Sequence, residues 1–386
     1  MVETIAVLGS TGSVGTQALE IAEFHHIRVT ALAAGSDVGR LEEQIRKFHP
    51  AAAALCDEKA AEDLRVRVAD TDTRVLGGKG SAEELASVSA ADTVVNAVTG
   101  IAGLRPTLAA LNSGKQVALA NKETMVAFGT EVMRLAQKRG LSILPVDSEH
   151  CAIFQCLQGN RSADVKKLIL TASGGPFFGM ERDAIRRMTA ADALRHPTWS
   201  MGPRITVDSA SLMNKGFEVI EAARLFGVTG EQIEVVVHRE SIIHSMVEYN
   251  DNAVLAQLSV PDMRLCIQYA LSWPERIESP LRELDFTALS GLTFAKPDTD
   301  AFPLLSLAYH ALAEGGVMPA AMNAADERAV SHFLAGKLRF GDIERIVTEM
   351  TLACPHVSSP SLSDVEEADT EARRRADDAV KALHGC

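Results

Sequence analysis

The sequence predicts an α/β protein that begins with a doubly wound, largely parallel sheet, continues into a mixed α+β region and ends in helices. Three observations support this prediction. Short apolar segments alternate with helical patterns up to about residue 150. A glycine-rich turn, GSTGSVG at 9–15, follows the first apolar segment. Beyond residue 300 apolar residues recur at helical spacing.

Composition limits the function. The 386 residues suffice for two or three domains, and a net charge of −13 argues against nucleic acid or an anionic membrane as the main partner. No apolar run is long enough to span a bilayer. The chain enters its first expected strand almost at once, so we expect no signal or transit peptide. The six cysteines form no C-x-x-C pair, so neither a zinc site nor a disulfide framework is indicated. We therefore expect a cytoplasmic protein with reduced thiols.

The first strand, turn and helix have the arrangement of a Rossmann-like dinucleotide site. A strand at 5–8 runs into the glycine turn, and a helix is expected at 17–24. The glycines let the backbone approach a pyrophosphate at the helix N-terminus. A second strand at 28–34 ends at Gly35-Ser36-Asp37. Asp37 favours NAD, whereas Ser36 and Arg40 can receive the extra phosphate of NADP, so the residues leave the cofactor open.

The remaining strands of this half deliver the first candidate site residues. They are expected at 51–54, 73–76, 93–98, 116–120 and 141–144, with a helix at 104–113. The strand at 116–120 ends at Asn121-Lys122-Glu123. Lys122 is a candidate to contact substrate or cofactor; the alternative is a Lys-Glu pair that starts the next helix.

Two carboxylates follow the strand at 141–144, in Pro145-Val-Asp147-Ser-Glu149-His150. In extended chain Asp147 and Glu149 would point to the same side, and they would repel each other unless a cation lay between them. Oxygen ligands suit a hard divalent ion, and ligands of α/β sheets bind beyond the strands' carboxyl ends. The alternative for this short motif is a solvated acidic turn.

The middle of the chain carries two glycine-containing segments. A strand at 167–171 leads into Ser173-Gly174-Gly175, which is either a small anion-binding nest or a simple Gly-Pro turn. The segment 195–202 holds Trp199 and lacks helical or strand periodicity. It is either a lid that closes over the site or a loop whose tryptophan is part of the core.

The densest polar cluster lies at 208–222. A helix extended back from Val219 places Asn214, Lys215 and Glu218 on one face near its N-terminus, where a phosphate is favoured. Glu218 would then be a third oxygen ligand beside Asp147 and Glu149. The alternative is an ordinary surface Lys-Glu pair. His238 and His244 lie in a strand-like run and are interpreted as structural residues rather than metal ligands.

These motifs, in this order, resemble the 1-deoxy-D-xylulose 5-phosphate reductoisomerase family over essentially the whole chain. The matching motifs are GSTGSVG at 9–15, LANKE at 119–123, PVDSEH at 145–150, SGGPF at 173–177, HPTWSMG at 196–202 and DSASLMNKGFEVIEA at 208–222. The resemblance implies Mg²⁺- or Mn²⁺-dependent rearrangement of 1-deoxy-D-xylulose 5-phosphate by retro-aldol cleavage and re-addition. Reduction by NADPH then gives 2-C-methyl-D-erythritol 4-phosphate, in non-mevalonate isoprenoid biosynthesis. It also implies a homodimer.

The resemblance also implies roles for individual residues. The implied metal ligands are Asp147, Glu149 and Glu218. The implied catalytic residues are Lys122, Glu149, His196 and Trp199, and Met201 joins Trp199 in a flap. Substrate binding is implied for Ser148, Glu149, Ser173, His196, Ser209, Asn214, Lys215 and Glu218. Cofactor binding is implied for Thr11, Gly12, Ser13, Val14, Gly35, Ser36, Asn121, Lys122, Glu123 and Gly202.

The expected domains follow the same resemblance. They are an NADPH-binding domain at 1–149, a central α+β catalytic domain at 150–275 with its flap at 195–203, a connecting segment at 276–300 and a C-terminal helical bundle at 301–386. Helices are expected there at 304–313, 319–334 and 342–353, with a final one ending near residue 383.

Three positions depart from the family pattern. His238-Arg239-Glu240-Ser241 replaces the usual His-Pro-Gln-Ser, Cys151 stands where relatives often have Asn or Ser, and Asp37 stands where a neutral or basic residue is common. Two other functions compete. A semialdehyde or homoserine-type dehydrogenase shares the opening turn, and the semialdehyde type needs a cysteine activated by histidine, for which Cys151 beside His150 is the candidate. A non-catalytic NADP-binding regulator would not need three carboxylates opposite a phosphate pocket.

Overall fold

The computed structural model describes residues 2–195, 198–199 and 201–384, and it divides into two compact units. The first unit comprises Met1–Thr124, Thr130–Cys151 and Asp262–Arg282. The second comprises Met125–Gly129, Ala152–Pro261 and Glu283–Cys386. The helix that follows Asp262 thus packs with the N-terminal part of the chain. The functional domains expected from the sequence remain a prediction.

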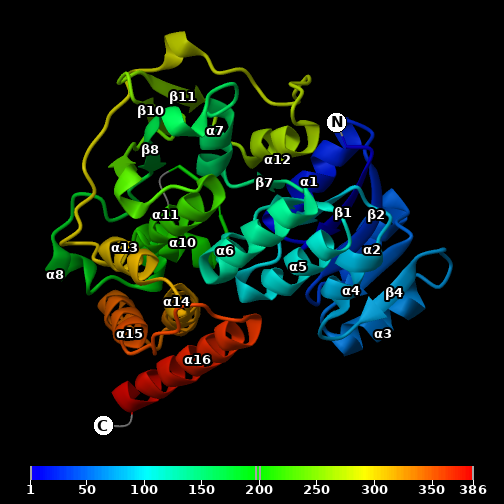
Figure 1. Cartoon of the computed structure of the whole chain (residues 1–386). Coiled ribbons are helices and arrows are strands. Elements are labelled where there is room, and N and C mark those ends of the chain that lie inside the picture. Colours follow the sequence, from blue (N-terminus) through cyan, green and yellow to red (C-terminus); the bar gives the residue numbers. More distant parts are fainter. Residues whose placement is uncertain (1, 196–197, 200, 385–386) are drawn as a thin grey trace. The chain divides into compact units, whose positions relative to one another are not determined.

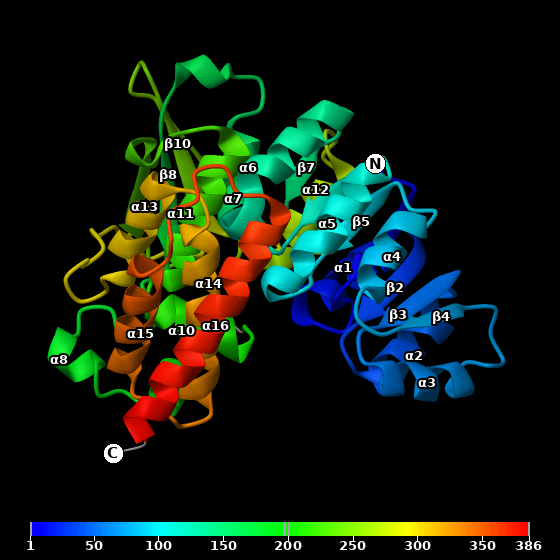
Figure 2. The same ribbon diagram turned by 60° about the horizontal axis from the view of Figure 1, so that its bottom comes forward.

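The first unit is built on a seven-stranded parallel sheet in the order β4-β3-β2-β1-β5-β6-β7 (Figures 1 and 2). Its strands are β1 (Thr4–Leu8), β2 (Arg28–Ala34), β3 (Ala52–Leu55), β4 (Arg74–Gly77), β5 (Thr93–Asn96), β6 (Gln116–Leu119) and β7 (Ile143–Pro145). The strand order reverses between β1 and β5, and ligands bind such sheets in the crevice at this point, beyond the carboxyl ends of the strands. The predicted doubly wound fold is confirmed.

Helices connect these strands. They are α1 (Ser13–Phe24), α2 (Val38–Phe48), α3 (Glu58–Arg67), α4 (Ser81–Val88), α5 (Leu104–Asn112) and α6 (Lys122–Arg139), with α12 (Met263–Ser272) from later in the chain. The predicted first helix begins four residues earlier than expected, inside the glycine-rich motif itself, with Gly12 as its N-cap. Helix α7 (Ser148–Cys156) leads from the first unit into the second.

The second unit combines a mixed four-stranded sheet with helices. The sheet has the order β11-β10-β8-β9, built from β8 (Val165–Ala172), β9 (Ile233–Val237), β10 (Ile243–Tyr249) and β11 (Val254–Leu258). Strand β10 is antiparallel to both its neighbours, whereas β8 and β9 are parallel. The helices are α8 (Arg182–Ile185), α9 (Ala190–Ala193), α10 (Pro203–Ala210), α11 (Met213–Phe226), α13 (Leu304–Glu314), α14 (Met318–Leu334), α15 (Phe340–Leu352) and α16 (Leu362–His384).

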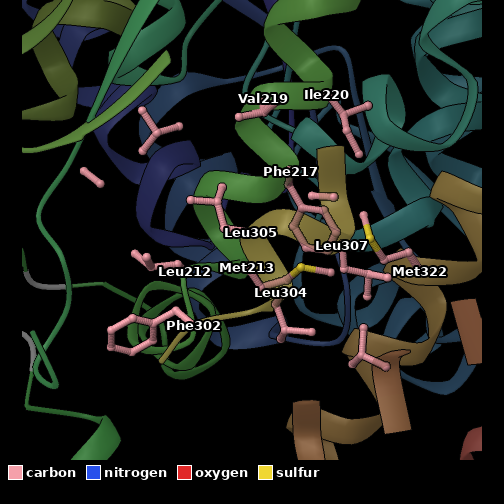
Figure 3. Packing of buried hydrophobic residues seen from close by; sticks show 14 of the residues in the cluster. Leu212, Met213, Phe217, Val219, Ile220, Phe302, Leu304, Leu305, Leu307 and Met322 are labelled. Carbon is pink, nitrogen blue, oxygen red and sulfur yellow. The ribbon is translucent and has the colours of Figure 1, made fainter. Parts of the chain in front are cut away.

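One apolar core joins the second sheet to the C-terminal helices. Figure 3 shows Phe217 of α11 close to Leu307 of α13 and Met322 of α14, and all three are almost fully buried. Residues 215–223 of helix α11 are all buried, so this stretch is enclosed by the unit rather than lying on its surface. Its charged side chains, Lys215, Glu218 and Glu221, are therefore held inside the protein.

The C-terminal helices match the predicted ranges to within two residues where an end was predicted. Helix α16, coloured red in Figure 2, packs along α14, and α15 packs against α14 as well. Among the described residues, no helix is both long enough and apolar enough to cross a lipid bilayer.

Candidate active site

The glycine-rich turn leaves β1 and enters α1 through backbone that only glycine tolerates. Gly9 has φ +80°, and a Cβ there would lie 2.4 Å from the carbonyl oxygen of Ala97. A Cβ at Gly15 would lie 2.2 Å from the Gly9 carbonyl oxygen. The turn therefore packs tightly between strand and helix. Thr11, Gly12, Ser13 and Val14 surround the N-terminus of α1, where backbone N–H groups and the helix dipole favour an anion.

The second glycine position lies beyond β2. Gly35 has open space around its Cα, and Ser36 is exposed. The Asp37 side chain caps α2 by accepting a hydrogen bond from the Arg40 backbone N–H at 3.1 Å. The exposed Arg40 guanidinium donates to the Thr11 carbonyl oxygen at 3.3 Å, so this cation reaches the glycine turn. The departure at Asp37 thus has a structural role as a helix cap.

Asn121 and Glu123 organise the turns after the central strands. The Asn121 side chain accepts a hydrogen bond from the Thr124 N–H, which caps α6, and donates to the carbonyl oxygens of Val98 and Gly100. The Glu123 carboxylate accepts from the Gly100 N–H at 3.2 Å. Both residues therefore fix backbone at the carboxyl ends of β5 and β6, the edge where the glycine turn also lies.

Lys122 and Asp147 form a buried ion pair, with 3.0 Å between the ammonium nitrogen and a carboxylate oxygen. The Asp147 carboxylate also lies 2.9 Å from Nδ1 of the fully buried His150, and it accepts a hydrogen bond from the Glu149 N–H. Sequence reasoning considered Glu123 as the partner of Lys122 and missed this pair. A pattern of adjacent residues cannot reveal a partner that follows a different strand of the sheet.

The expected extended chain from Asp147 to Glu149 is wrong. Helix α7 begins at Ser148. The side chain of Asp147, the residue before it, accepts hydrogen bonds from the backbone N–H groups of Glu149 and His150 in the first turn. Ser148 donates its hydroxyl to the Glu149 carboxylate at 2.6 Å. A helix starts here because Asp is a favoured cap residue and an acid is stabilised in the first turn. Lys122, Asp147, Ser148 and Glu149 thus lie together in the first unit.

In the second unit the Ser-Gly-Gly turn packs against the end of α10. Gly174 and Gly175 have φ +77° and +64°, and the Gly175 N–H donates to the Ser173 hydroxyl. A Cβ at Gly175 would lie 2.7 Å from the Ser209 carbonyl oxygen, so no other residue allows the turn to come this close. Ser173 and Ser209, predicted to bind the same phosphate, are brought together by this contact.

A sharp corner between α10 and α11 places the remaining cluster. Leu212 is buried and has φ +58°, a conformation costly for a residue with a branched side chain. After it, the Asn214 amide donates to one Glu218 oxygen at 2.5 Å and the Lys215 ammonium pairs with the other. Lys215 and Glu218 are both buried, so the ordinary surface-pair interpretation is wrong. Charged groups are rarely buried except where paired.

The segment predicted as a lid is described in part. His196 lies outside the described residues, whereas Trp199 is half-buried with its ring centroid 6.1 Å from that of His244. The Thr198 hydroxyl donates to the Arg239 carbonyl oxygen at 3.3 Å. Burial lowers the pKa of His244 to about 4, so its ring is neutral at pH 7. Met201 and Gly202 follow, and Gly202 is the N-cap of α10.

His238 is a structural histidine, as interpreted from the sequence. Its Nε2 accepts hydrogen bonds from the N–H groups of Ile242 and Ile243, so Nδ1 carries the proton and donates to the Thr293 carbonyl oxygen. Its neighbour Arg239 was not singled out in the sequence. The Arg239 guanidinium donates to the Gly175 carbonyl oxygen at 3.0 Å, which ties it to the Ser-Gly-Gly turn. The sign of this contact that the sequence offered was Arg239 itself, which departs from the family's His-Pro-Gln-Ser pattern.

Cys151 does not have the setting of a catalytic nucleophile. It is fully buried, and its thiol is hydrogen-bonded with that of Cys266, which together with burial holds the pKa of Cys266 well above its usual range. A nucleophilic cysteine needs access and an activating cation. The adjacent His150 instead directs Nδ1 to Asp147.

Comparisons with known proteins agree along the whole chain. The family model described as 1-deoxy-D-xylulose 5-phosphate reductoisomerase matches residues 5–129, and two models of C-terminal domains of the same enzyme match 143–226 and 258–375. A relative of that name from Acetivibrio thermocellus is 49% identical over 99% of this chain and 100% of its own length. One from Heliobacterium modesticaldum is 50% identical over 98% of each chain.

Two solved structures are similar throughout. The reductoisomerase from Zymomonas mobilis in complex with NADPH is 40% identical, covers 98% of this chain and 99% of its own, and has a TM-score of 0.92. A structure of the enzyme with NADPH, fosmidomycin and magnesium is also 40% identical, covers 99% of each chain and has a TM-score of 0.94. This chain belongs to the 1-deoxy-D-xylulose 5-phosphate reductoisomerase family.

Proposed function

We propose that this chain converts 1-deoxy-D-xylulose 5-phosphate to 2-C-methyl-D-erythritol 4-phosphate, by metal-dependent rearrangement of the carbon skeleton and reduction by NADPH. The observation that carries the proposal is the full-length identity of 49% to a relative of that name. Along that length, the described motif residues stand at strand ends and helix N-termini, where this chemistry needs them.

The glycine turn fits the cofactor. Gly9 and Gly15 have no room for a side chain, so the turn brings its backbone close to the N-terminus of α1. That N-terminus is the position for the pyrophosphate of NADPH. Thr11, Gly12, Ser13 and Val14 would hold it, with Gly35 and Ser36 at the adenosine end. Arg40 would receive the 2′-phosphate, because its guanidinium is exposed beside the turn while Asp37 is engaged as a cap. Gly202, Asn121 and Glu123 complete the proposed cofactor set.

The carboxylates fit a divalent cation. We propose Asp147, Glu149 and Glu218 as ligands of one Mg²⁺ or Mn²⁺, since oxygen ligands with negative charge suit hard cations. Asp147 and Glu218 are each buried beside a lysine, Lys122 and Lys215. Charged groups are rarely buried except where paired, so both carboxylates lie at places where the protein already favours positive charge. A bound divalent ion supplies Lewis-acid polarisation of the substrate's carbonyl and hydroxyl oxygens.

The second unit fits the phosphate end of the substrate. The turn that carries Ser173 packs against the Ser209 backbone, and Asn214 and Lys215 lie in the first turn of α11, where helix N–H groups favour an anion. Ser148 and Lys122 would contact the carbon chain. His196 and Trp199 would close over the substrate and exclude water, which protects a cleaved intermediate from side reactions.

We also propose a homodimer formed through β11. This strand is at the edge of its sheet and is exposed or half-exposed along its length, and Val254 and Leu255 are 47% and 44% exposed on successive, opposite faces. An apolar edge strand favours pairing with another chain, and a second copy is the partner expected for this family. Val254→Lys with Leu255→Glu should give a monomer by light scattering; an unchanged mass would refute β11 as the interface.

We propose that the enzyme acts in the cytoplasm. None of the described cysteines is in a disulfide, and buried thiols such as those of Cys151 and Cys266 are characteristic of reducing compartments.

The test of the proposed function is NADPH oxidation in the presence of 1-deoxy-D-xylulose 5-phosphate, followed at 340 nm, with and without metal. Turnover should require the sugar phosphate, disappear with EDTA and return with Mg²⁺ or Mn²⁺. Unchanged turnover in EDTA would refute the metal site. Binding of NADPH without turnover on this substrate would support the regulator instead.

A further inference from the structure

Two buried acids connect the proposed phosphate site to the C-terminal helices. Asp208 lies on α10, immediately before Ser209, and is 4% exposed. Asp326 lies on α14 and is 0% exposed. Helix α14 packs against α10, and through Met322, one turn before Asp326, it also reaches the core around α11 (Figure 3). Asp326 is therefore held rigidly beneath the end of α10.

Cations around this pair are fewer than acids. On α10, Arg204 lies 3.7 Å from Asp208 and 3.2 Å from Glu327 of α14, and it donates to the Asn323 amide oxygen at 3.4 Å. On α16, Arg373 pairs with Asp369 and with Glu327, each at 2.7 Å. Helices α13 and α15 contribute apolar side chains such as Leu307 and Ile346. Among these described groups, four carboxyls face two guanidiniums.

The surroundings of Asp326 favour a protonated carboxyl. Its side chain is fully buried, and neither of its oxygens accepts an N–H or O–H from another described residue. A buried carboxylate without hydrogen-bond donors costs much more free energy than the neutral acid. The buried Asp208 is a second acid beside it, and two neighbouring buried carboxyls cannot both ionise without strong repulsion. Burial, together with the Asp208 charge, raises the pKa of Asp326 well above its usual range.

We propose that Asp208 and Asp326 share one proton, and that this acid pair fixes the end of α10, which makes Asp326 a positioning residue for the Ser209 phosphate contact. The inference rests on the proposed role of Ser209 in substrate binding. Because Ser209 follows Asp208 directly and its carbonyl abuts Gly175, a shift at Asp208 moves both serines of the phosphate site. Charge repulsion after loss of the proton would produce that shift.

The pH dependence has a definite sign. The folded state keeps a proton at Asp326 that an unfolded chain loses above the ordinary pKa of about 3.8. The free energy of unfolding therefore falls as pH rises through the range between these two pKa values. Asp326→Asn replaces the proton permanently with an amide N–H donor of the same shape, so this loss should disappear.

The shared proton is tested without substrate, by thermal unfolding of the wild-type protein and Asp326→Asn from pH 5.5 to 9. The Tm difference in favour of Asp326→Asn should grow steadily with pH, by about 3 °C or more over the range. A difference that is constant with pH, or a Tm of Asp326→Asn that falls faster than that of wild type, would overturn the shared proton.

The positioning role is tested by kinetics of the same proteins and of Asp326→Leu. Asp326→Leu should raise the KM for 1-deoxy-D-xylulose 5-phosphate about tenfold and leave the KM for NADPH unchanged, and Asp326→Asn should restore the wild-type value. Asp369→Asn is the matched control, because Asp369 is a buried acid on α16 that pairs with Arg373; its KM should not change. Equal KM values in Asp326→Leu and wild type would refute positioning.

Ser209→Ala separates this inference from the proposed function. If that variant keeps the wild-type KM for the sugar phosphate, the role of Ser209 fails and positioning through it fails as well, while the melting series still decides the shared proton. If Ser209→Ala raises KM and Asp326→Leu does not, the proposed function stands and the positioning role of Asp326 is wrong.

Discussion

The two buried acids Asp147 and Glu218 are held in different ways, although each has a lysine beside it. Asp147 follows β7, caps α7, and contacts Lys122 at the start of α6 as well as His150. Glu218 lies within α11, and its carboxylate contacts Asn214 and Lys215 one turn earlier on the same helix. The first acid ties three elements of its unit together, whereas these contacts of the second stay within one helix.

Because of this difference, replacing the two candidate ligands should reduce the stability of the protein by different amounts. Removing the charge of Asp147 breaks its ion pair with Lys122 on another helix, and removing the whole side chain also removes the cap of α7. Removing the charge of Glu218 leaves an amide oxygen that still accepts hydrogen bonds from its own helix. Function should thus be separable from stability at Glu218 and only partly separable at Asp147.

The largest effect is expected for Glu218→Gln. We expect kcat/KM to fall roughly 10³-fold through loss of a ligand charge, with a loss of stability of about 1 kcal/mol or less. Steady-state kinetics and thermal unfolding of the same preparation measure both. Activity near that of wild type would show that Glu218 is not a metal ligand. A large fall in Tm would show that Glu218, like Asp147, is needed for stability.

Lys215→Ala should come next, with a KM for the sugar phosphate about 10²-fold higher, because a charge-assisted contact to the phosphate is lost. The KM for NADPH should stay the same. The surface lysine Lys166, which pairs with Glu248 in the same unit, provides a control that should not respond. An unchanged KM in Lys215→Ala would show that this lysine serves only to neutralise Glu218.

Asp147 tests the other side of the comparison. Asp147→Asn and Asp147→Ala should both lose activity, but Ala should be the less stable by about 1 kcal/mol, since Asn can still cap α7. Urea unfolding of the two variants gives this difference. Equal stabilities would mean that the cap contributes nothing, and Asp147 and Glu218 would then be equivalent.

A smaller effect is expected at Arg40, an exposed cation in contrast to the buried lysines. Arg40→Ala should raise the KM for NADPH about tenfold and leave the KM for NADH unchanged, since only NADPH carries the 2′-phosphate. An equal rise of the KM values for NADPH and NADH would show that Arg40 supports the glycine turn rather than binding the 2′-phosphate.

The smallest effect is expected for Cys151→Ala, on the helix that Asp147 caps. Activity should stay within about twofold of wild type, because the buried thiol has no route to the substrate. Abolished activity in a folded protein, checked by circular dichroism, would revive the cysteine-dependent dehydrogenase.

The sequence alone determined the parallel sheet and the C-terminal helices, because these depend on local patterns. The candidate residues follow mostly from the resemblance of its motifs to the family, and their roles stay predictions. Alternating apolar segments specify strands, and GSTGSVG or DSASLMNKG encode a turn and a helix start within a few residues. The helix after Asp147 could also have been inferred, since Asp followed by Ser-Glu is a common helix start, but the apolar strand before it favoured extended chain.

Only the tertiary structure decided which charges neutralise one another. Lys122 pairs with Asp147, Arg239 donates to the Gly175 carbonyl oxygen, and Asp326 lies beside Asp208, each across a separation of more than twenty residues. Sequence reasoning weighed Lys215 and Glu218 as a surface pair because their spacing is the same whether α11 is exposed or buried. The physical reason is that the strength of an ionic contact depends on desolvation, and desolvation is a property of the packed core rather than of the local sequence.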